Sequence, residues 1–184
     1  MKVFAILGSR NPEGQTARAT AALIEGIAAA GGDAQQAFLP LLQVERCRQC
    51  EENGWGICRR EGRCVIEDDF AALAQRIREA DAVVFSNPVY YSDLSESLRA
   101  FTDRLRRVCA HESGRQGIAD KPAIGICVAG GGGGGAPAAI VTLEKVMRSC
   151  RLDVVDLIPV RRQNLAMKET VLRVTGRWFA EDRK

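Results

Sequence analysis

The fold is decided by residues 2–16, which read KVFAILGSRNPEGQT. Lys2–Leu7 is a short apolar run that predicts a strand, and the alanine-rich segment after Thr16 has the spacing of a helix. Gly8–Thr16 then leads the chain to a helix N-terminus, where free backbone N–H groups and the helix dipole hold an anion. The stretch therefore indicates a strand, a phosphate-binding loop and a helix. An ordinary strand-to-helix connection is the alternative, since short loops with Gly and Ser are common.

Polar side chains in this loop suit a phosphate. Ser9 and Thr16 carry hydroxyl groups, Gln15 an amide and Arg10 a guanidinium. The loop resembles the triphosphatase pattern G-x-x-x-x-G-K-[ST], but it is one residue longer and has Gln15 in place of the lysine. The pattern therefore favours a monophosphate that is bound and not cleaved.

Strand and helix patterns alternate along the rest of the chain. Strands are predicted over residues 34–39, 81–86, 122–129 and 153–160. Helices are predicted over residues 15–30, from Asp68 or Asp69, over 94–108, from Pro137, and at about 165–180, where apolar residues recur at Met167, Val171, Val174 and Trp178. Leu41–Cys64 and His111–Asp120 are expected to be loops. We expect a single domain over residues 1–184, with a cysteine-containing insertion at about 41–66.

This alternation implies an α/β fold: a five-stranded parallel sheet with helices on both faces, which is a three-layer sandwich. A phosphate loop after the first strand suits the flavodoxin-like order 2-1-3-4-5, in which ligands bind beyond the carboxyl ends of the strands. Three loops of unusual composition leave that edge: Gly8–Thr16, Asn87–Ser92 and the six glycines Gly130–Gly135. The glycine run also satisfies G-x-G-x-x-G, but any six glycines would, so we do not interpret it as a dinucleotide motif.

Composition excludes several classes. The chain has 184 residues and a net charge of +3, too small and too dispersed to indicate nucleic-acid binding. No apolar run approaches the roughly 20 residues that span a bilayer. The N-terminus lacks the pattern of a signal peptide, so we expect a cytoplasmic protein without membrane or nucleic-acid partners. Seven cysteines in a reducing compartment suggest metal, cluster or redox chemistry before disulfides.

Three blocks of sequence resemble one superfamily. Gly8–Thr16 is similar to the G-S-P-R-x-x-G-N-T loop of NAD(P)H-dependent FMN reductases, with Asn11 at the position of the arginine and Gln15 at that of the asparagine. Residues 87–104 resemble its S-P-V-Y … L-K-x-F-I-D-R block. Residues 47–69 resemble the C-x-x-C … G-x-C-x-x-x-D-D segment of its iron–sulfur flavoprotein branch.

The resemblance implies an FMN-dependent oxidoreductase that takes electrons from NAD(P)H and passes them to a small-molecule acceptor of the flavin or quinone type. The flavin carries the redox chemistry, so no catalytic side chain is expected. The predicted cofactor-binding residues are Ser9, Arg10, Asn11, Gln15, Thr16, Asn87, Pro88, Val89, Tyr90, Tyr91, Gly130, Gly131, Gly132 and Gly133. A homo-oligomer, dimer or tetramer, is implied too, with Leu41–Cys64 and the C-terminal helix around Trp178 and Phe179 as candidate contacts.

The cysteines form two groups. Cys47, Cys50, Cys58 and Cys64 have the spacing C-x2-C-x7-C-x5-C, which admits an iron–sulfur cluster, structural zinc or free thiols. Asn53 stands where the iron–sulfur branch has its third cysteine, so a cluster is possible but not favoured. Cys109, Cys127 and Cys150 fall on apolar stripes and are predicted to be core residues.

Two other functions remain open at this stage. A non-enzymatic electron carrier of the flavodoxin or iron–sulfur flavoprotein type would use the same fold and cofactor. A zinc-stabilised interaction domain would use the cysteines and no flavin.

Overall fold

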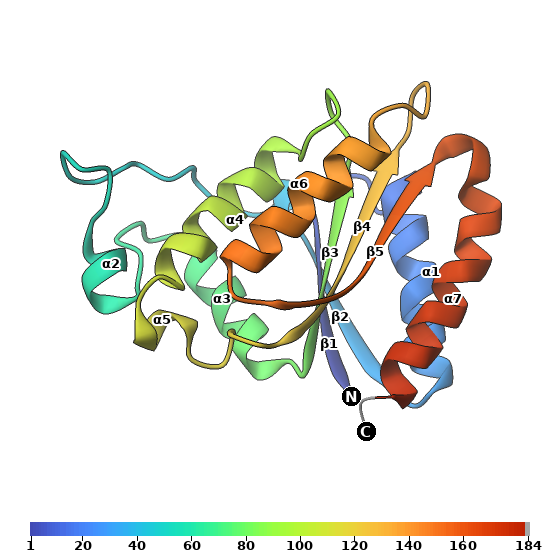
Figure 1. Ribbon diagram of the computed structural model, residues 1–184, viewed down its shortest axis with the longest axis horizontal. Coiled ribbons are helices and arrows are strands. Elements are labelled where there is room, and N and C mark those ends of the chain that lie inside the picture. Colours follow the sequence, from blue (N-terminus) through green and yellow to red (C-terminus); the bar gives the residue numbers. More distant parts are fainter. Residues whose placement is uncertain (183–184) are drawn as a thin grey trace.

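The computed structural model describes residues 1–182. Its centre is a parallel sheet of five strands in the order β2-β1-β3-β4-β5, as predicted (Figure 1). The strands are β1 (Lys2–Leu7), β2 (Asp33–Phe38), β3 (Ala82–Pro88), β4 (Pro122–Ala129) and β5 (Asp153–Arg161). The carboxyl ends of β1, β3 and β4 lie side by side in this order, so the loops that follow them share one edge of the sheet.

Helices cover both faces of the sheet. One face carries α1 (Gln15–Ala29) and α7 (Leu165–Glu181), and the other carries α3 (Phe70–Glu79), α4 (Glu96–Val108) and α6 (Ala136–Ser149) (Figure 1). No described helix is both long and apolar enough to span a membrane. The three-layer sandwich predicted from the sequence is confirmed.

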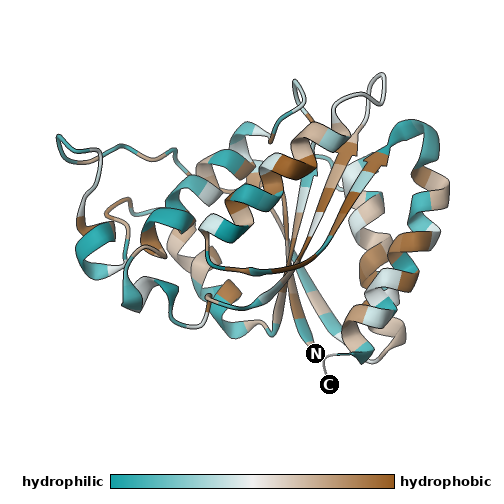
Figure 2. Cartoon of the chain, in the orientation of Figure 1, coloured by the Kyte–Doolittle hydropathy of each residue, from teal (hydrophilic) through white to brown (hydrophobic). Residues whose placement is uncertain are grey.

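Alternation along β1 shows how the two cores form. Val3 and Leu7 pack toward α1 and α7, whereas Phe4 and Ile6 pack toward α3 and α4. All seven residues of β3 are buried, as expected for a central parallel strand covered on both faces. In Figure 2 the hydrophobic colouring accordingly gathers on the strands and on the helix faces turned toward them.

Two glycines allow α1 and α7 to pack closely. A Cβ atom on Gly26 would lie 2.1 Å from the Arg173 carbonyl oxygen, and one on Gly176 would lie 2.1 Å from the Leu23 carbonyl oxygen. Neither backbone atom can give way as a flexible side chain could, so a larger residue would push the helices apart. The glycine at position 176, which looks like a mild interruption in the sequence, is thus the contact point of the two helices.

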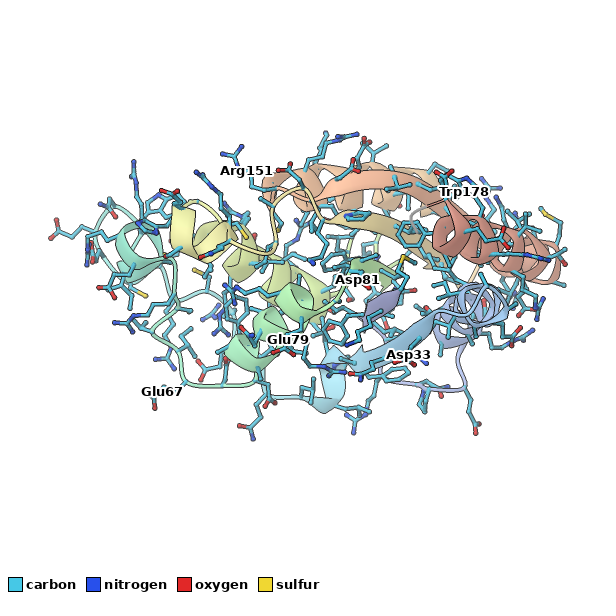
Figure 3. All side chains as sticks on the ribbon, turned by 90° about the horizontal axis from the view of Figure 1, so that it is seen from below. Asp33, Glu67, Glu79, Asp81, Arg151 and Trp178 are labelled. Atoms are coloured by element: carbon cyan, nitrogen blue, oxygen red, sulfur yellow. The ribbon has the colours of Figure 1, made fainter. Side chains whose placement is uncertain are left out.

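The predicted C-terminal helix is present as α7, but the apolar stripe that predicted it lies on the outer side of the helix. Met167, Val171, Val174 and Trp178 are exposed, and Figure 3 shows Trp178 on this helix. The inner face consists of a different set: Leu165, Leu172, Gly176, Phe179 and Ala180. Phe179 is fully buried, so naming it as a contact for another subunit was wrong.

Two short helices lie in segments that the sequence predicted to be loops. Helix α2 (Ile57–Glu61) interrupts the Leu41–Cys64 connection, and α5 (Glu112–Arg115) follows His111, whose ring nitrogen accepts a hydrogen bond from the Ser113 N–H at 3.2 Å. Two 3-10 turns, Leu39–Leu41 and Arg162–Asn164, complete the described elements. Helices of four or five residues are too short to show a periodic apolar pattern.

Arg104 and Asp68 fasten the cysteine-containing segment to the core. Their side chains are 1% and 4% exposed, and two guanidinium nitrogens donate to the carboxylate at 2.6 and 2.9 Å. Arg104 also donates to the Glu45 carbonyl at 3.0 Å and stacks on the Phe70 ring at 4.2 Å. One buried ion pair therefore joins α4 to both ends of the segment.

Candidate functional site

Three loops at the carboxyl edge of the sheet enclose one cavity. Its volume is about 300 Å³, within the range of small-molecule sites. The lining residues come from all three predicted loops and from β4: Gln15, Thr16, Pro88, Val89, Tyr90, Val128, Gly130 and Gly131. The opposite edge of the sheet carries acidic side chains instead, among them Asp33, Glu79 and Asp81 (Figure 3).

The N-terminus of α1 forms the first wall. Gly14 is the residue before the helix, and no side chain caps the first turn, which also contains no acidic residue. The backbone N–H groups of this turn are thus left for an external anion. Ser9 and Thr16 are buried beside it, while Arg10 is exposed to solvent.

Asn11 shapes the loop from inside. Its side-chain oxygen accepts a hydrogen bond from the Glu13 N–H at 2.9 Å, and its backbone carbonyl accepts one from the Gly14 N–H at 3.1 Å. These bonds form a tight turn that delivers the chain to the helix. The side-chain oxygen of Asn11 is therefore occupied within the loop, which leaves its amide nitrogen for a ligand.

Asn87 holds the second loop in place. It is fully buried, and its oxygen accepts from the Ser95 N–H at 2.8 Å while its amide nitrogen donates to the Asp93 carbonyl at 3.3 Å. Both ends of the amide are therefore used between β3 and the start of α4. Asn87 is not among the residues that line the cavity, and its contact with a cofactor stays a prediction.

The two predicted tyrosines occupy different environments. Tyr90 lines the cavity, and its N–H and C=O pair with Asp93 to close a tight turn. Tyr91 and Ser92 fill that turn with φ angles of 50° and 64°, a left-handed conformation that non-glycine residues seldom adopt. The turn leaves the Tyr91 side chain fully exposed, outside the cavity lining.

The third wall is the start of the glycine run. Gly130 and Gly131 line the cavity, and a Cβ atom on Gly131 would meet nothing within 4 Å. Gln163, just beyond β5, donates from its side chain to the Gly132 carbonyl at 3.0 Å. Gln163 was not among the residues predicted from the sequence. Its position after the last strand, at the same edge of the sheet, was the only signal.

One buried polar atom of a residue that lines the cavity has no partner among the described residues. The side-chain oxygen of Gln15 is buried and accepts no hydrogen bond from any described residue. A Cβ atom on Gly130 would lie 3.9 Å from it, so the oxygen stands between the first and third walls. An unpaired buried acceptor costs about 1–3 kcal/mol, and a donor group that reached this oxygen would remove that cost.

The four cysteines of the inserted segment surround a different and much smaller cavity. It measures about 20 Å³ and is also lined by Trp55, Arg104 and Arg107. Within residues 1–182 no group of three or more His, Cys, Asp or Glu side chains is placed to hold a metal ion. The arrangement therefore does not fit an iron–sulfur cluster or a zinc ion. The cysteines involved are Cys47, Cys50, Cys58 and Cys64.

The remaining three cysteines are buried in the core, as predicted. Burial raises the pKa of the Cys109 thiol to about 11 and that of the Cys127 thiol to about 12. Burial also raises the pKa of Cys150 well above its usual value. These thiols are neutral at physiological pH and serve as packing groups.

The family model described as NADPH-dependent FMN reductase matches residues 1–165. This chain belongs to the NADPH-dependent FMN reductase family. The matched residues include all three walls of the cavity and end at Leu165, the first residue of α7. The match confirms the resemblance inferred from the three blocks of sequence.

Curated relatives of this chain carry the name iron–sulfur flavoprotein. One from Methanocaldococcus jannaschii is 32% identical over 106 residues, which are 58% of this chain and 52% of the relative. Another from Methanosarcina thermophila is 30% identical over 110 residues, 58% of this chain and 55% of the relative. The chain thus spans about half the length of the curated relatives it matches.

Solved structures show the same fold at low identity. An NAD(P)H:quinone oxidoreductase from Methanothermobacter marburgensis superposes with a TM-score of 0.68 at 20% identity, covering 97% of this chain and 96% of the other. A flavodoxin from the domain Archaea gives a TM-score of 0.63 at 14% identity, covering 99% and 98%. The flavodoxin-like fold of this FMN reductase family member is thereby confirmed.

Proposed function

We propose that this chain binds FMN in the cavity of about 300 Å³ and acts as an NAD(P)H-dependent oxidoreductase. The observation that carries the proposal is the meeting of three loops, each singled out in the sequence, around one cavity beside the uncapped N-terminus of α1. Membership of the NADPH-dependent FMN reductase family supports the choice of cofactor.

The residues present fit FMN. The phosphate would be held by the first-turn N–H groups of α1 with Ser9, Thr16 and Arg10, and by the amide nitrogen of Asn11. The unpaired Gln15 oxygen would accept a hydrogen bond from a hydroxyl or N–H group of the cofactor. Gly130–Gly133 offer backbone N–H groups where no side chain intervenes.

The second loop would hold the flavin ring. Pro88, Val89 and Tyr90 form an apolar wall of the cavity. The hydrogen bonds of Asn87 and Gln163 hold the second loop and the glycine run in position. Tyr91 stands free to contact the electron acceptor or a neighbouring molecule. The chemistry that FMN would supply at this site is hydride uptake from the nicotinamide and electron transfer to the acceptor. The side chains bind the cofactor, orient it and exclude water from it.

The acceptor would be a small molecule of the flavin or quinone class. Two solved structures that share the fold are described as an NAD(P)H:quinone oxidoreductase and as an azoreductase, and these names support an acceptor of this class. We also propose a cytoplasmic location, from the sequence pattern of the N-terminus, and a homo-oligomer, dimer or tetramer, by resemblance to related flavoproteins.

The test is to titrate the protein, freed of flavin, with FMN and to follow quenching of flavin fluorescence. One site per chain is expected, and Arg10→Ala is expected to weaken binding because it removes a cation from the phosphate end. Arg148→Ala is the matched control, since Arg148 lies on α6 and pairs with Glu144. Equal affinities in all three proteins would place Arg10 outside the site.

A steady-state assay separates an enzyme from a carrier. The oxidoreductase should oxidise NADPH or NADH many times per chain when a quinone is supplied. Bound FMN without turnover would favour the electron carrier, a role that the name iron–sulfur flavoprotein of the relatives also admits.

A further inference from the structure

Four thiols gather around the small cavity of the inserted segment, which the proposed function does not use. Cys47, Cys50, Cys58 and Cys64 line this thiol cavity, and all four are free. Cys50 is exposed and the other three are half-buried, so a small molecule can reach them. The cavity measures about 20 Å³, and one water needs about 10–15 Å³, so it admits only a molecule slightly larger than water.

Two arginines of α4 bring hydrogen-bond donors that lack acceptors. Arg104 and Arg107 both line the thiol cavity. The Nε atom of each is buried and forms no hydrogen bond with any described residue, although the Arg104 side chain is only 1% exposed. An oxygen atom in the cavity that reached either Nε–H group would remove the cost of leaving it unpaired.

The second of these arginines also leaves a positive charge beside the thiols. Arg104 is paired with Asp68, whereas Arg107 forms no ion pair within residues 1–182. Its guanidinium donates to the Gly54 carbonyl at 2.6 Å and lies over the Trp55 ring. Oxidation of a thiol moves negative charge from sulfur to a departing oxygen, and a cation held in a site of low water content stabilises that charge.

Cys64 is the thiol that interacts with Arg104. Burial alone would lower the pKa of Arg104, but the hydrogen bond with Asp68, followed by the charge of Cys64 and a hydrogen bond with it, outweighs burial and raises that pKa. Arg104 also donates to the Ile66 carbonyl at 3.4 Å, so the backbone just after Cys64 is held against the same guanidinium. The Cys64 side chain packs on the buried core beneath it.

We propose that the thiol cavity is a modification site, at which hydrogen peroxide oxidises Cys64 and a disulfide then closes within the inserted segment. Hydrogen peroxide is the oxidant that fits, because it is little larger than water and its oxygens accept hydrogen bonds from N–H groups. A larger oxidant such as glutathione disulfide does not enter a cavity of about 20 Å³.

The reaction balances with peroxide as its only oxidant. The Cys64 sulfur attacks a peroxide oxygen: the S–O bond forms, the O–O bond breaks, and the departing hydroxide takes the thiol proton and becomes water. A second thiol of the cavity attacks the sulfenic sulfur: the S–S bond forms, the S–O bond breaks, and hydroxide leaves with the second thiol proton as water. Two thiols become one disulfide, and one peroxide is reduced to two waters. Arg107 stabilises the departing oxygen in both steps.

The test counts thiols in the flavin-loaded protein after reduction and removal of the reductant. About ten equivalents of hydrogen peroxide should lower the count after denaturation from seven to five and the mass by about 2 Da. Peptide mapping without reduction should place the bond between Cys64 and another cysteine of the cavity. Neither readout involves turnover, and the thiol cavity shares no lining residue with the proposed FMN site, so the result does not depend on the flavin chemistry.

Variants test the two roles. Cys64→Ser should keep all six of its thiols, whereas Cys109→Ala, the matched control from the core, should still lose two. Arg107→Leu should slow the loss of thiols at least about fivefold, because it removes the charge that stabilises the departing oxygen. Arg106→Leu is its control, since Arg106 is the neighbouring residue on α4 and pairs with Asp103 at 3.1 Å. Circular dichroism would verify that each variant folds.

Several results would overturn the proposal. They are seven thiols after peroxide treatment, a disulfide that excludes Cys64 or links two chains, and continued loss of two thiols in Cys64→Ser. An equal rate for Arg107→Leu and wild type would overturn it too. So would iron or zinc at one per chain in the purified protein with the four thiols protected from peroxide.

Discussion

The substitution Asp68→Ala tests how the cysteine-containing segment is held. It removes the carboxylate that takes two hydrogen bonds from Arg104, and it leaves a guanidinium that is only 1% exposed without its charged partner. It also removes the acceptor of the Glu45 and Phe70 N–H groups, at 2.8 and 3.1 Å. Breaking one side of a buried ion pair costs about 3–5 kcal/mol, so we expect a loss of that size in the free energy of unfolding.

Urea unfolding at pH 7, followed by circular dichroism, would measure this loss. Asp103→Ala is the matched control, because Asp103 lies on the same helix as Arg104 and its pair with Arg106 is 37% and 36% exposed. An exposed pair contributes about 0–1 kcal/mol. A loss below about 1 kcal/mol for Asp68→Ala, or one no larger than that of Asp103→Ala, would refute the argument.

The ion pair between Asp68 and Arg104 also predicts how the free energy of unfolding changes with pH. Burial alone would raise the pKa of Asp68, but hydrogen bonds from Arg104 and from the two backbone N–H groups outweigh it and hold the pKa below its usual range. A depressed folded-state pKa contributes stability that is fully present above the unfolded value of about 3.9 and is lost as the pH falls through the folded value. The difference between wild type and Asp68→Ala should therefore be constant near neutral pH and shrink below about pH 4.

Two further outcomes follow from the site and the core. Gln163→Leu removes the hydrogen bond to the Gly132 carbonyl, so the FMN dissociation constant, measured by fluorescence titration, should rise about five- to tenfold, whereas Gln75→Leu on the distant helix α3 should leave it unchanged. In a thiol titration with a disulfide reagent at pH 8, Cys109, Cys127 and Cys150 should react only after denaturation, because burial raises their pKa values. Rapid reaction of all seven thiols in the native protein would contradict their placement in the core.

The sequence predicts the sheet well because buried parallel strands are short apolar runs. Residues 122–129 match β4 at both ends, and the strand order 2-1-3-4-5, which the predicted phosphate loop after β1 suits, is confirmed. The orientation of helix α7 could not be predicted in this way. It carries two apolar stripes, one on each side, and periodicity predicts the helix without indicating which side faces the sheet.

The candidate site is only partly visible in the sequence. Gly14, Gln15 and the glycine run stand out because their composition is unusual. Asn87 looks like a ligand in the motif, but its amide is used by Ser95 and Asp93, a contact that depends on where α4 begins. Gln163 belongs to no motif, since its role exists only when β5 brings it beside β4.

The surroundings of the four cysteines in the inserted segment could not be predicted from the sequence either. Their spacing left a cluster, zinc and free thiols open, and only the three-dimensional arrangement shows that they surround a cavity of about 20 Å³. Trp55 lines that cavity, and the guanidinium groups of Arg59 and Arg107 lie over its ring at 5.4 and 4.8 Å from the ring centroid. No property of the cysteine spacing predicts this packing.

The central claim is that the cavity between the three loops holds FMN, and one measurement tests it most directly. The protein is purified, its absorbance spectrum is recorded, and the flavin released on denaturation is identified and counted, with added FMN supplied if the yield is low. We expect a yellow protein that carries or takes up one FMN per chain and whose flavin is bleached by NADPH or NADH. A colourless protein that takes up no FMN would contradict it.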